Sequence, residues 1–382
     1  MQGNKFNSEK LVEARMARGL TQAQLAKYLG IDRQSMYRYE KGTAPRPELR
    51  EKIADVLEVP SGFFSDYRNE YIEEQSTIHY RKYASTKIIE REQIKVQNHW
   101  VYKIYKLLSN YVAFPLFDLP GNIMKLTKED FYTEDEIEII ASTLRKEWNL
   151  SDEPIKNLAQ LLESKGIIIG NRISYSDQTA KRVDACSELI EGRPFIFIEH
   201  DKSSARLRFS LAHELGHIIL HKYVTEHDLE DKKTYKKIEA EAFYFAGAFL
   251  LPSTSFANEV WSTKLEHLVS LKKRWRVSIQ AMIMRANKLG LYSHEQKENL
   301  IISMGRKKIR TNEPLDDIIP IEHPVLFKQA FSLILKSGKE TISSIKWKIG
   351  LNGDKIEMLS SLPLEMLEKK IEEPIPHLRL VK

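Results

Sequence analysis

Residues 211–221 read Leu-Ala-His-Glu-Leu-Gly-His-Ile-Ile-Leu-His, an apolar run interrupted by His213, Glu214, His217 and His221. Residues four apart on an α-helix share a face, so the side chains of His213 and His217 can point toward one centre. Two imidazoles in this arrangement bind a zinc ion, and the glutamate between them acts as general base. The alternative is an amphipathic core helix with two hydrogen-bonded histidines. The stretch predicts a helix that carries a metal site.

A catalytic zinc site needs a third protein ligand from another element. His221 is unsuitable, because on the same helix it would lie about 12 Å along the axis from His213. Segment 237–252 is a helical run whose only acidic residues are Glu239 and Glu241. Enclosed glutamates are costly unless their charge is compensated, which a metal would do. Because the two lie nearly opposite each other on a helix, one can face the metal while the other makes a supporting or surface contact.

The composition is that of an ordinary globular protein, with 42% hydrophobic and 29% charged residues in 382. No apolar run approaches the length of a membrane span, and the first five residues lack the apolar core of a signal peptide. A single cysteine, Cys186, excludes an internal disulfide framework and a cysteine-based zinc site, so a reducing cytoplasm is expected. The net charge of +6 permits a nucleic-acid partner without requiring one.

Residues 8–60 predict a compact head of five short helices. Thr21 can cap a helix over 22–29 that Gly30 closes, and Asp32 can cap the next helix over 33–40. Two short helices joined by a tight glycine-containing turn form a helix-turn-helix, whose second helix enters the major groove of DNA.

The second of these helices is expected to expose side chains that reach base edges or phosphates. Residues 1–60 hold eleven Lys/Arg and eight Asp/Glu, a net charge of +3. A small helical domain that binds only protein is the alternative. The residues predicted on the exposed, DNA-facing side are Arg33, Gln34, Ser35, Tyr37 and Arg38.

The head resembles the phage-repressor-like (XRE-type) helix-turn-helix family over about fifty residues. The resemblance is carried by Leu20-Thr21-Gln22, Gln24-Leu25-Ala26, Leu29-Gly30-Ile31, Tyr39-Glu40-Lys41-Gly42 and Pro47. It implies double-stranded operator DNA as a partner. It also implies that Gln22 touches a phosphate, while Arg33, Gln34 and Tyr37 lie in the groove.

The middle of the chain predicts a helical connector followed by a mixed α/β region. From Arg81 to Lys106 there are seven Lys/Arg and two Asp/Glu with apolar residues at helical spacing, which favours a helix packed on the next domain over an additional nucleic-acid or dimer surface. Residues 167–169 and 195–198 predict short buried strands. If the second lies at a sheet edge, its free backbone groups can pair an extended peptide beside the metal.

Residues 135–295 resemble the ImmA/IrrE family of metallopeptidases. The resemblance is carried by Gly192-Arg193-Pro194-Phe195-Ile196-Phe197, Asp201-Lys202-Ser203-Ser204, Arg208-Phe209, the His-Glu-Leu-Gly-His stretch with His221, Glu239-x-Glu241-Ala242, Phe245-Ala246, Leu250-Leu251-Pro252, residues 271–278 and Arg285-Ala286. It implies that His213, His217 and Glu239 bind Zn²⁺ and that Glu214 is the catalytic base. Phe243 departs from the family, which usually has Asn there. Because that residue is not a ligand, the departure concerns local hydrogen bonding only.

The resemblance implies metal-assisted peptide hydrolysis. Zinc lowers the pKa of its water toward about 7 and polarises the scissile carbonyl, while Glu214 takes the proton and passes it to the leaving amine. An additional donor to the oxyanion is expected among Tyr175, His200, His221 and Tyr223.

We expect an α+β protein, mainly α with a small β-sheet. It would comprise a five-helix helix-turn-helix head (1–68), a helical connector (69–133), a zincin-like HExxH metallopeptidase domain (134–295) and a helical C-terminal extension (296–382). Residues 342–367 have a helix-turn-helix-like pattern, for which a packing or dimerisation role is favoured.

The expected function is a cytoplasmic DNA-binding transcriptional regulator. Its zinc endopeptidase would cleave a specific repressor- or antitoxin-like protein in phage, mobile-element or stress-response control. A homodimer is compatible with this interpretation, and a membrane is not involved. The alternatives are a transcription factor whose peptidase-like domain senses a ligand without cleavage, and an antitoxin-like protein that acts by binding alone.

Overall fold

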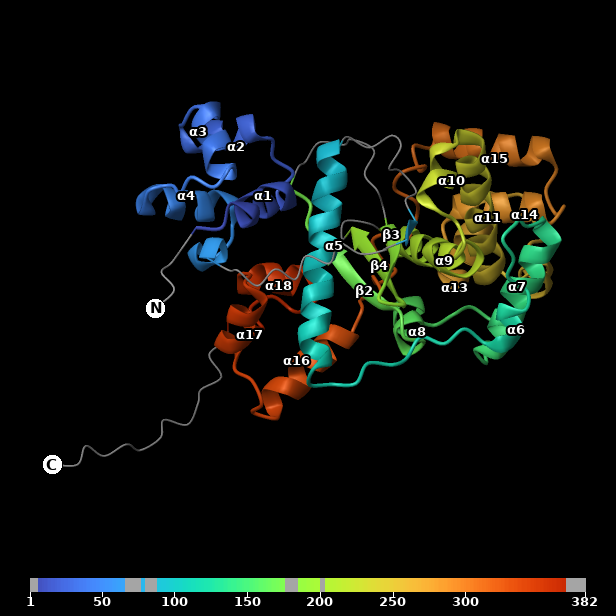
Figure 1. Cartoon of the computed structure of the whole chain (residues 1–382). Coiled ribbons are helices and arrows are strands. Elements are labelled where there is room, and N and C mark those ends of the chain that lie inside the picture. The colour runs from blue at the N-terminus through green and yellow to red at the C-terminus, as the bar shows by residue number, and fades with distance from the viewer. Residues whose placement is uncertain (1–5, 66–76, 80–87, 176–184, 200–202, 369–382) are drawn as a thin grey trace.

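The computed structural model describes residues 6–65, 77–79, 88–175, 185–199 and 203–368 (Figure 1). It is mainly helical with one four-stranded sheet, as the α+β prediction requires. None of the helices within these ranges is both long and apolar enough to cross a bilayer.

The head consists of α1 (Ser8–Ala17), α2 (Gln22–Leu29), α3 (Arg33–Glu40), α4 (Pro47–Leu57) and the 3₁₀ helix η1 (Ser61–Ser65). The side chain of Thr21 accepts a hydrogen bond from the backbone N–H of Gln24, and Gly30 ends α2 in the left-handed region at φ 68°. Glycine adopts that conformation without the steric penalty of a Cβ, so α3 can start after Asp32 at a sharp angle to α2. At the start of α1, the side chain of Asn7 accepts hydrogen bonds from the backbone N–H groups of Glu9 and Lys10.

The sheet has the strand order β1-β3-β4-β2. Its strands are β1 (Thr77–His79), β2 (Ile168–Arg172), β3 (Ala185–Ile190) and β4 (Arg193–Glu199). β3 pairs antiparallel with both β1 and β4, whereas β2 runs parallel to β4. The strand at 185–190 was not predicted, because its sequence mixes polar and apolar residues.

β4 is an interior strand. Because β3 and β2 pair with its two sides, its backbone groups are used within the sheet. Residues 195–198 therefore do not offer an edge to an extended peptide, which corrects the expectation for a substrate-binding edge. Among the described residues the edges belong to β1 and β2.

Both faces of the sheet are covered, so its strands are apolar on both sides. Along β4, Ile196 and Ile198 belong to a cluster with the helices of the metal site, whereas Phe195 and Phe197 belong to a cluster on the opposite face. The helices of the first side are α6 (Gly121–Met124), α7 (Glu134–Glu147), α8 (Leu158–Ser164), α9 (Ser204–Leu220), α10 (Glu226–Glu230), α11 (Lys232–Leu250), α12 (Ser253–Glu259), α13 (Leu265–Trp275), α14 (Ile279–Lys288) and α15 (His294–Arg306).

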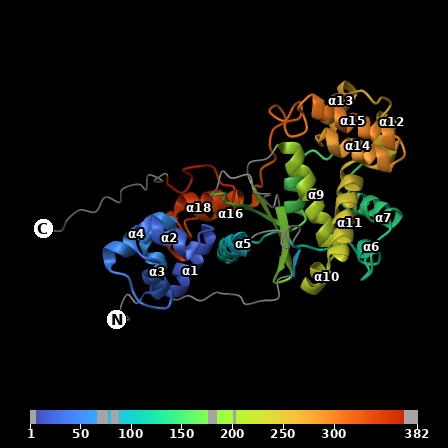
Figure 2. The ribbon, with the colours of Figure 1, turned by 90° about the horizontal axis from the view of Figure 1, so that it is seen from above.

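Helix α5 (Ile88–Ser109) lies between the head and the sheet (Figure 2). The indole N–H of Trp100 donates to Glu13 of α1 at 2.7 Å, and the Gln97 side chain bonds the carbonyls of Ala17 and Ile173, each at 3.0 Å. On the sheet side, Val101 packs against Gly170 of β2, where a Cβ would lie 2.4 Å from a Val101 methyl. Over Ile88–Ser109 the helix packs between the head and the sheet, as the favoured interpretation requires, whereas residues 81–87 of that prediction lie outside the described residues.

The C-terminal unit packs on the same side as the head. It contains α16 (Leu326–Lys336), α17 (Ile342–Ile349) and α18 (Gly353–Leu359). Lys355 of α18 donates to the carbonyl of Leu57 at 2.8 Å, and Asn352 donates to that of Glu58 at 3.1 Å. Head, α5, one sheet face and this unit therefore share one apolar cluster. The division of the chain at 68, 133 and 295 stays a prediction.

Helices α17 and α18 repeat the helix–glycine–helix geometry of the head. Thr341 caps α17, Gly350 ends it at φ 77°, and α18 starts after Asn352. In α18, however, Lys355 and Ile356 are buried against neighbouring elements. The equivalent of a DNA-reading helix is thus used for internal packing, in agreement with the packing role favoured for this region.

Candidate metal centre and DNA-binding surface

Helix α9 places the histidines of residues 211–221 in the interior, against α11. His213, Glu214 and His217 are almost completely buried. Gly216 lies where α9 packs tightly on α11, since a Cβ at this position would come within 3.2 Å of the Ala242 backbone and 3.1 Å of the Phe245 ring. A glycine there lets α11 bring its glutamates beside the histidines.

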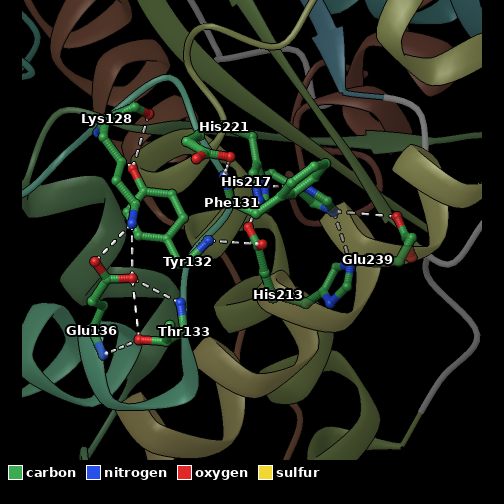
Figure 3. Close-up of polar contacts among 11 residues, drawn as sticks. Lys128, Phe131, Tyr132, Thr133, Glu136, His213, His217, His221 and Glu239 are labelled. Atoms are coloured by element: carbon green, nitrogen blue, oxygen red, sulfur yellow. Dashed lines mark hydrogen bonds and ion pairs between the residues drawn. The ribbon is translucent and has the colours of Figure 1, made fainter.

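Three side chains converge on one point (Figure 3). The Nε2 atoms of His213 and His217 are 3.0 Å apart. The carboxylate oxygens of Glu239 lie 3.7 Å from Nε2 of His213 and 3.4 Å from Nε2 of His217. Ligand atoms around a tetrahedral zinc are about 3.3 Å apart, since zinc–ligand bonds are about 2.0–2.1 Å long. The donor set and its spacing therefore fit zinc with a fourth position for water or substrate.

The remaining acidic residue of the motif, Glu214, is held by the sheet. Its Oε2 accepts a hydrogen bond of 2.8 Å from Oγ of Ser187 on β3. Ser187 is completely buried and lies opposite His79 of β1 in the strand register. Ser187 was not predicted as a site residue, because nothing in the sequence around it distinguishes a core serine from one that bonds the carboxylate of Glu214.

The second glutamate of α11 serves a different group. Oε2 of Glu241 lies 3.0 Å from Nε2 of His221, and its Oε1 accepts the backbone N–H of Tyr132 at 2.9 Å. Nδ1 of His221 lies 3.0 Å from Nδ1 of His217, on the side of that ring turned away from Glu239. His221 thus stands behind the three-residue cluster, which agrees with its exclusion as a ligand.

In the head, four of the predicted DNA-facing residues of α3 are exposed: Arg33, Gln34, Tyr37 and Arg38. Ser35 is not, which corrects its placement on that face. Its hydroxyl donates to Asp32 at 2.7 Å, because the third residue of a helix lies beside the N-cap side chain. Those bonds hold the pKa of the Asp32 carboxyl below its usual range.

Gln22 belongs to a polar cluster behind the exposed face. Its side-chain amide donates to Glu40 at 2.6 Å, and Glu40 also accepts from Arg15 of α1. Arg15 in turn donates to the carbonyl of Leu20 at 2.7 Å. The contact with Glu40 holds Gln22 at the start of α2; its contact with phosphate remains a prediction.

Two families match the chain. Residues 11–64 match the helix-turn-helix family, and residues 168–287 match a peptidase family described as the IrrE N-terminal-like domain. The chain joins a helix-turn-helix domain to an IrrE-like domain. No curated protein matches it.

One solved structure that matches is a Mycobacterium tuberculosis transcriptional regulator with 16% sequence identity and a TM-score of 0.29. The match covers 50% of this chain and 51% of that one, so the chain spans about half of the length of this relative.

Phe243, where the resemblance to the ImmA/IrrE family predicts Asn, stands beside the site. Its ring lies 4.6 Å from that of Phe209 and 6.3 Å from that of His213, measured between centroids. Where the family usually has an amide, this chain has an apolar wall against one of the two histidines. The substitution leaves the positions of His213, His217 and Glu239 compatible with a metal.

The four residues expected as oxyanion donors differ in where they lie and in what they contact. Tyr175 stacks on Arg18 of the head at 4.1 Å, and burial raises the pKa of its hydroxyl. His221 is engaged behind His217. His200 lies outside the described residues, and Tyr223 is half-exposed in the segment after α9. Tyr223 therefore stays a prediction for this role.

Proposed function

We propose that the protein is a DNA-binding transcriptional regulator whose IrrE-like domain is a zinc-dependent endopeptidase that cleaves a specific regulatory protein. The observation that carries the proposal is the convergence of His213, His217 and Glu239 beside Glu214. Zinc bound by the three would supply Lewis acidity, polarising the scissile carbonyl and acidifying the attacking water.

Glu214 is the residue that separates catalysis from metal binding. It lies next to His213 on α9, and its carboxylate is held at Oε2 by Ser187. A carboxylate in this position can accept a proton from the attacking water and pass it to the leaving amine. A site that only binds metal has no use for this carboxylate.

The proposed restriction to a specific substrate is supported by the way the sheet is paired. Among the described residues, a peptide that adds to the sheet on the Ser187 side has to pair with β1, because β3 and β4 are both interior strands. β1 already pairs with β3 from Thr77 to His79. We therefore expect the protein to hydrolyse a cognate repressor- or antitoxin-like protein and not unfolded proteins in general.

The alternative is a regulator whose IrrE-like domain senses a ligand or a partner without cleavage. It is favoured only by the closed packing of the site, since His213 and Glu214 are almost completely buried. This alternative requires metal binding at most and predicts no dependence on Glu214.

The test compares the wild type with Glu214→Gln, each loaded with Zn²⁺ and incubated with the repressor-like proteins encoded beside its gene. We expect the wild type to cut one of them and Glu214→Gln to be slower by about 10²–10⁴-fold, the usual contribution of a general base. The control is Glu266→Gln, the same chemical change on an exposed side chain of α13. Equal cleavage, or equal regulatory activity in cells, by wild type and Glu214→Gln would refute the peptidase.

A further inference from the structure

A series of hydrogen bonds leads from the three candidate metal ligands, His213, His217 and Glu239, to a segment outside the IrrE-like match. It runs from His217 to His221, from His221 to Glu241, and from Glu241 to the backbone of Tyr132. The three contacts measure 3.0, 3.0 and 2.9 Å. Its last member, Tyr132, precedes the matched residues 168–287 and lies next to the start of α7.

We infer that His221 and Glu241 are positioning residues that fix the ring orientation and tautomer of the zinc ligand His217. This inference rests on the proposed metal site, and it gives a role to two residues that are not themselves metal ligands.

When a metal is bound at Nε2 of His217, the hydrogen bonds from His217 through His221 to Glu241 can have only one direction of donation. A neutral imidazole that ligates through Nε2 carries its proton on Nδ1. Nδ1 of His217 then donates to Nδ1 of His221, so the proton of His221 lies on Nε2 and is donated to Glu241. The carboxylate of Glu241 accepts at both oxygens, the second bond coming from the N–H of Tyr132. In this series of three hydrogen bonds, each donor therefore faces an acceptor.

Burial makes this chain more than a surface contact. His221 and Glu241 are 3% and 7% exposed. Hydrogen bonds that orient a metal ligand from behind fix its ring and raise its basicity, and losing such a partner costs about 10–100-fold in metal affinity.

The far end of the chain is itself fixed. The Tyr132 hydroxyl accepts the backbone N–H of Lys128 at 2.8 Å, and Lys128 forms an ion pair with Glu136 at 2.7 Å. Glu136 also accepts the N–H of Thr133 at 2.8 Å, which caps α7 (Figure 3). These bonds hold the pKa of Glu136 down at about 2. The segment 128–136, whose Tyr132 N–H is bonded to Glu241, is therefore tied together by several local hydrogen bonds.

The test measures the zinc dissociation constant by competition with a chromophoric chelator for His221→Ala, His221→Asn and Glu241→Gln in the full chain. We expect His221→Ala to bind zinc 10–100-fold more weakly. His221→Asn should recover part of this loss, because an amide oxygen can still accept from His217. Glu241→Gln should fall between wild type and His221→Ala, since an amide offers one acceptor oxygen where the carboxylate offers two.

Two controls separate positioning from general damage. Glu214→Gln should bind zinc like the wild type, because Glu214 is not a ligand. His267→Ala removes a hydrogen-bonded histidine from α13, outside the site, and should leave zinc affinity unchanged.

The outcomes distinguish this inference from the proposed function. A wild type that does not bind zinc overturns both. A wild type that binds zinc together with an equally tight His221→Ala overturns the inference alone. Should His221→Ala fail to fold, nitrogen-15 spectra of the imidazoles in the zinc-loaded wild type decide. Protons on Nδ1 of His217 and Nε2 of His221 support the inference, and the opposite assignment overturns it.

Discussion

At the scale of single residues, the two functional regions differ in how their side chains are held. The side chains of the metal cluster are buried and bonded on several sides, as Glu214 is by Ser187 and Glu241 by Tyr132. Arg33 and Gln34, in contrast, extend from α3 into solvent. Their positions are set by the helix and not by partners, so their contribution is expected to appear only on DNA.

Arg33→Ala and Gln34→Ala are each expected to weaken binding to the operator by about 1–3 kcal/mol, the usual value of a base contact. The measurement is a titration against a duplex that the wild type selects from a randomised library. Arg306→Ala removes the same charge from α15, outside the head, and should leave binding unchanged. Operator affinity that is unchanged in Arg33→Ala and Gln34→Ala would contradict the assignment of α3 to the groove.

At the scale of elements, α5 approaches the sheet closely at a point where β2 has a glycine. Gly170 of β2 leaves room for the methyl groups of Val101. The same sheet carries Ser187 on its other face, hydrogen-bonded to the carboxylate of Glu214. The packing of α5 thus supports the strands on which the site is built.

Gly170→Ala is expected to lower the free energy of unfolding by about 1–3 kcal/mol through overpacking. Val101→Ala should also lower the free energy of unfolding. The loss in the double variant should be smaller than the sum of the two single losses by about 1 kcal/mol or more, because the new methyl group occupies the space that the valine methyl groups vacate. Urea denaturation measures all three. Gly121→Ala, where a Cβ meets nothing within 4 Å, is the control. Strict additivity would show that the two residues do not meet as described.

At the scale of the whole molecule, the apolar interior is divided by the sheet. One cluster joins the head, α5 and α16–α18, and the other surrounds α9, α11 and the helices that follow. The DNA-binding head is therefore packed on the side of the sheet opposite to the metal cluster.

Phe331→Ala in α16 and Phe256→Ala in α12 remove matched, completely buried rings from the two clusters. Each should cost about 3–5 kcal/mol. In hydrogen exchange, Phe331→Ala should reduce protection mainly in α1 and α5, and Phe256→Ala mainly in α11. Equal losses in all of these helices would show that the two clusters unfold as one unit.

Local sequence was sufficient to predict the helix-turn-helix and the helix that carries His213 and His217. In both, the information lies in residues a few positions apart: caps at Thr21 and Asp32, a left-handed glycine at Gly30, and histidines one helical turn apart. The helical interpretation of 237–252 also limited the third ligand to Glu239 or Glu241. Helix periodicity and capping depend only on near neighbours, and a single sequence contains them in full.

The tertiary structure decided what depends on distant residues. It placed Glu239 beside the histidines and Glu241 behind them, turned Ser35 inward, made β4 an interior strand, and brought Ser187 and Tyr132 to the site. Strand order and contacts between separate elements are fixed by which faces pack together. Ser187 lies 27 residues from Glu214 along the chain, and Tyr132 lies 109 residues from Glu241. No local pattern specifies such pairs, because their free energy comes from burial that exists only in the folded chain.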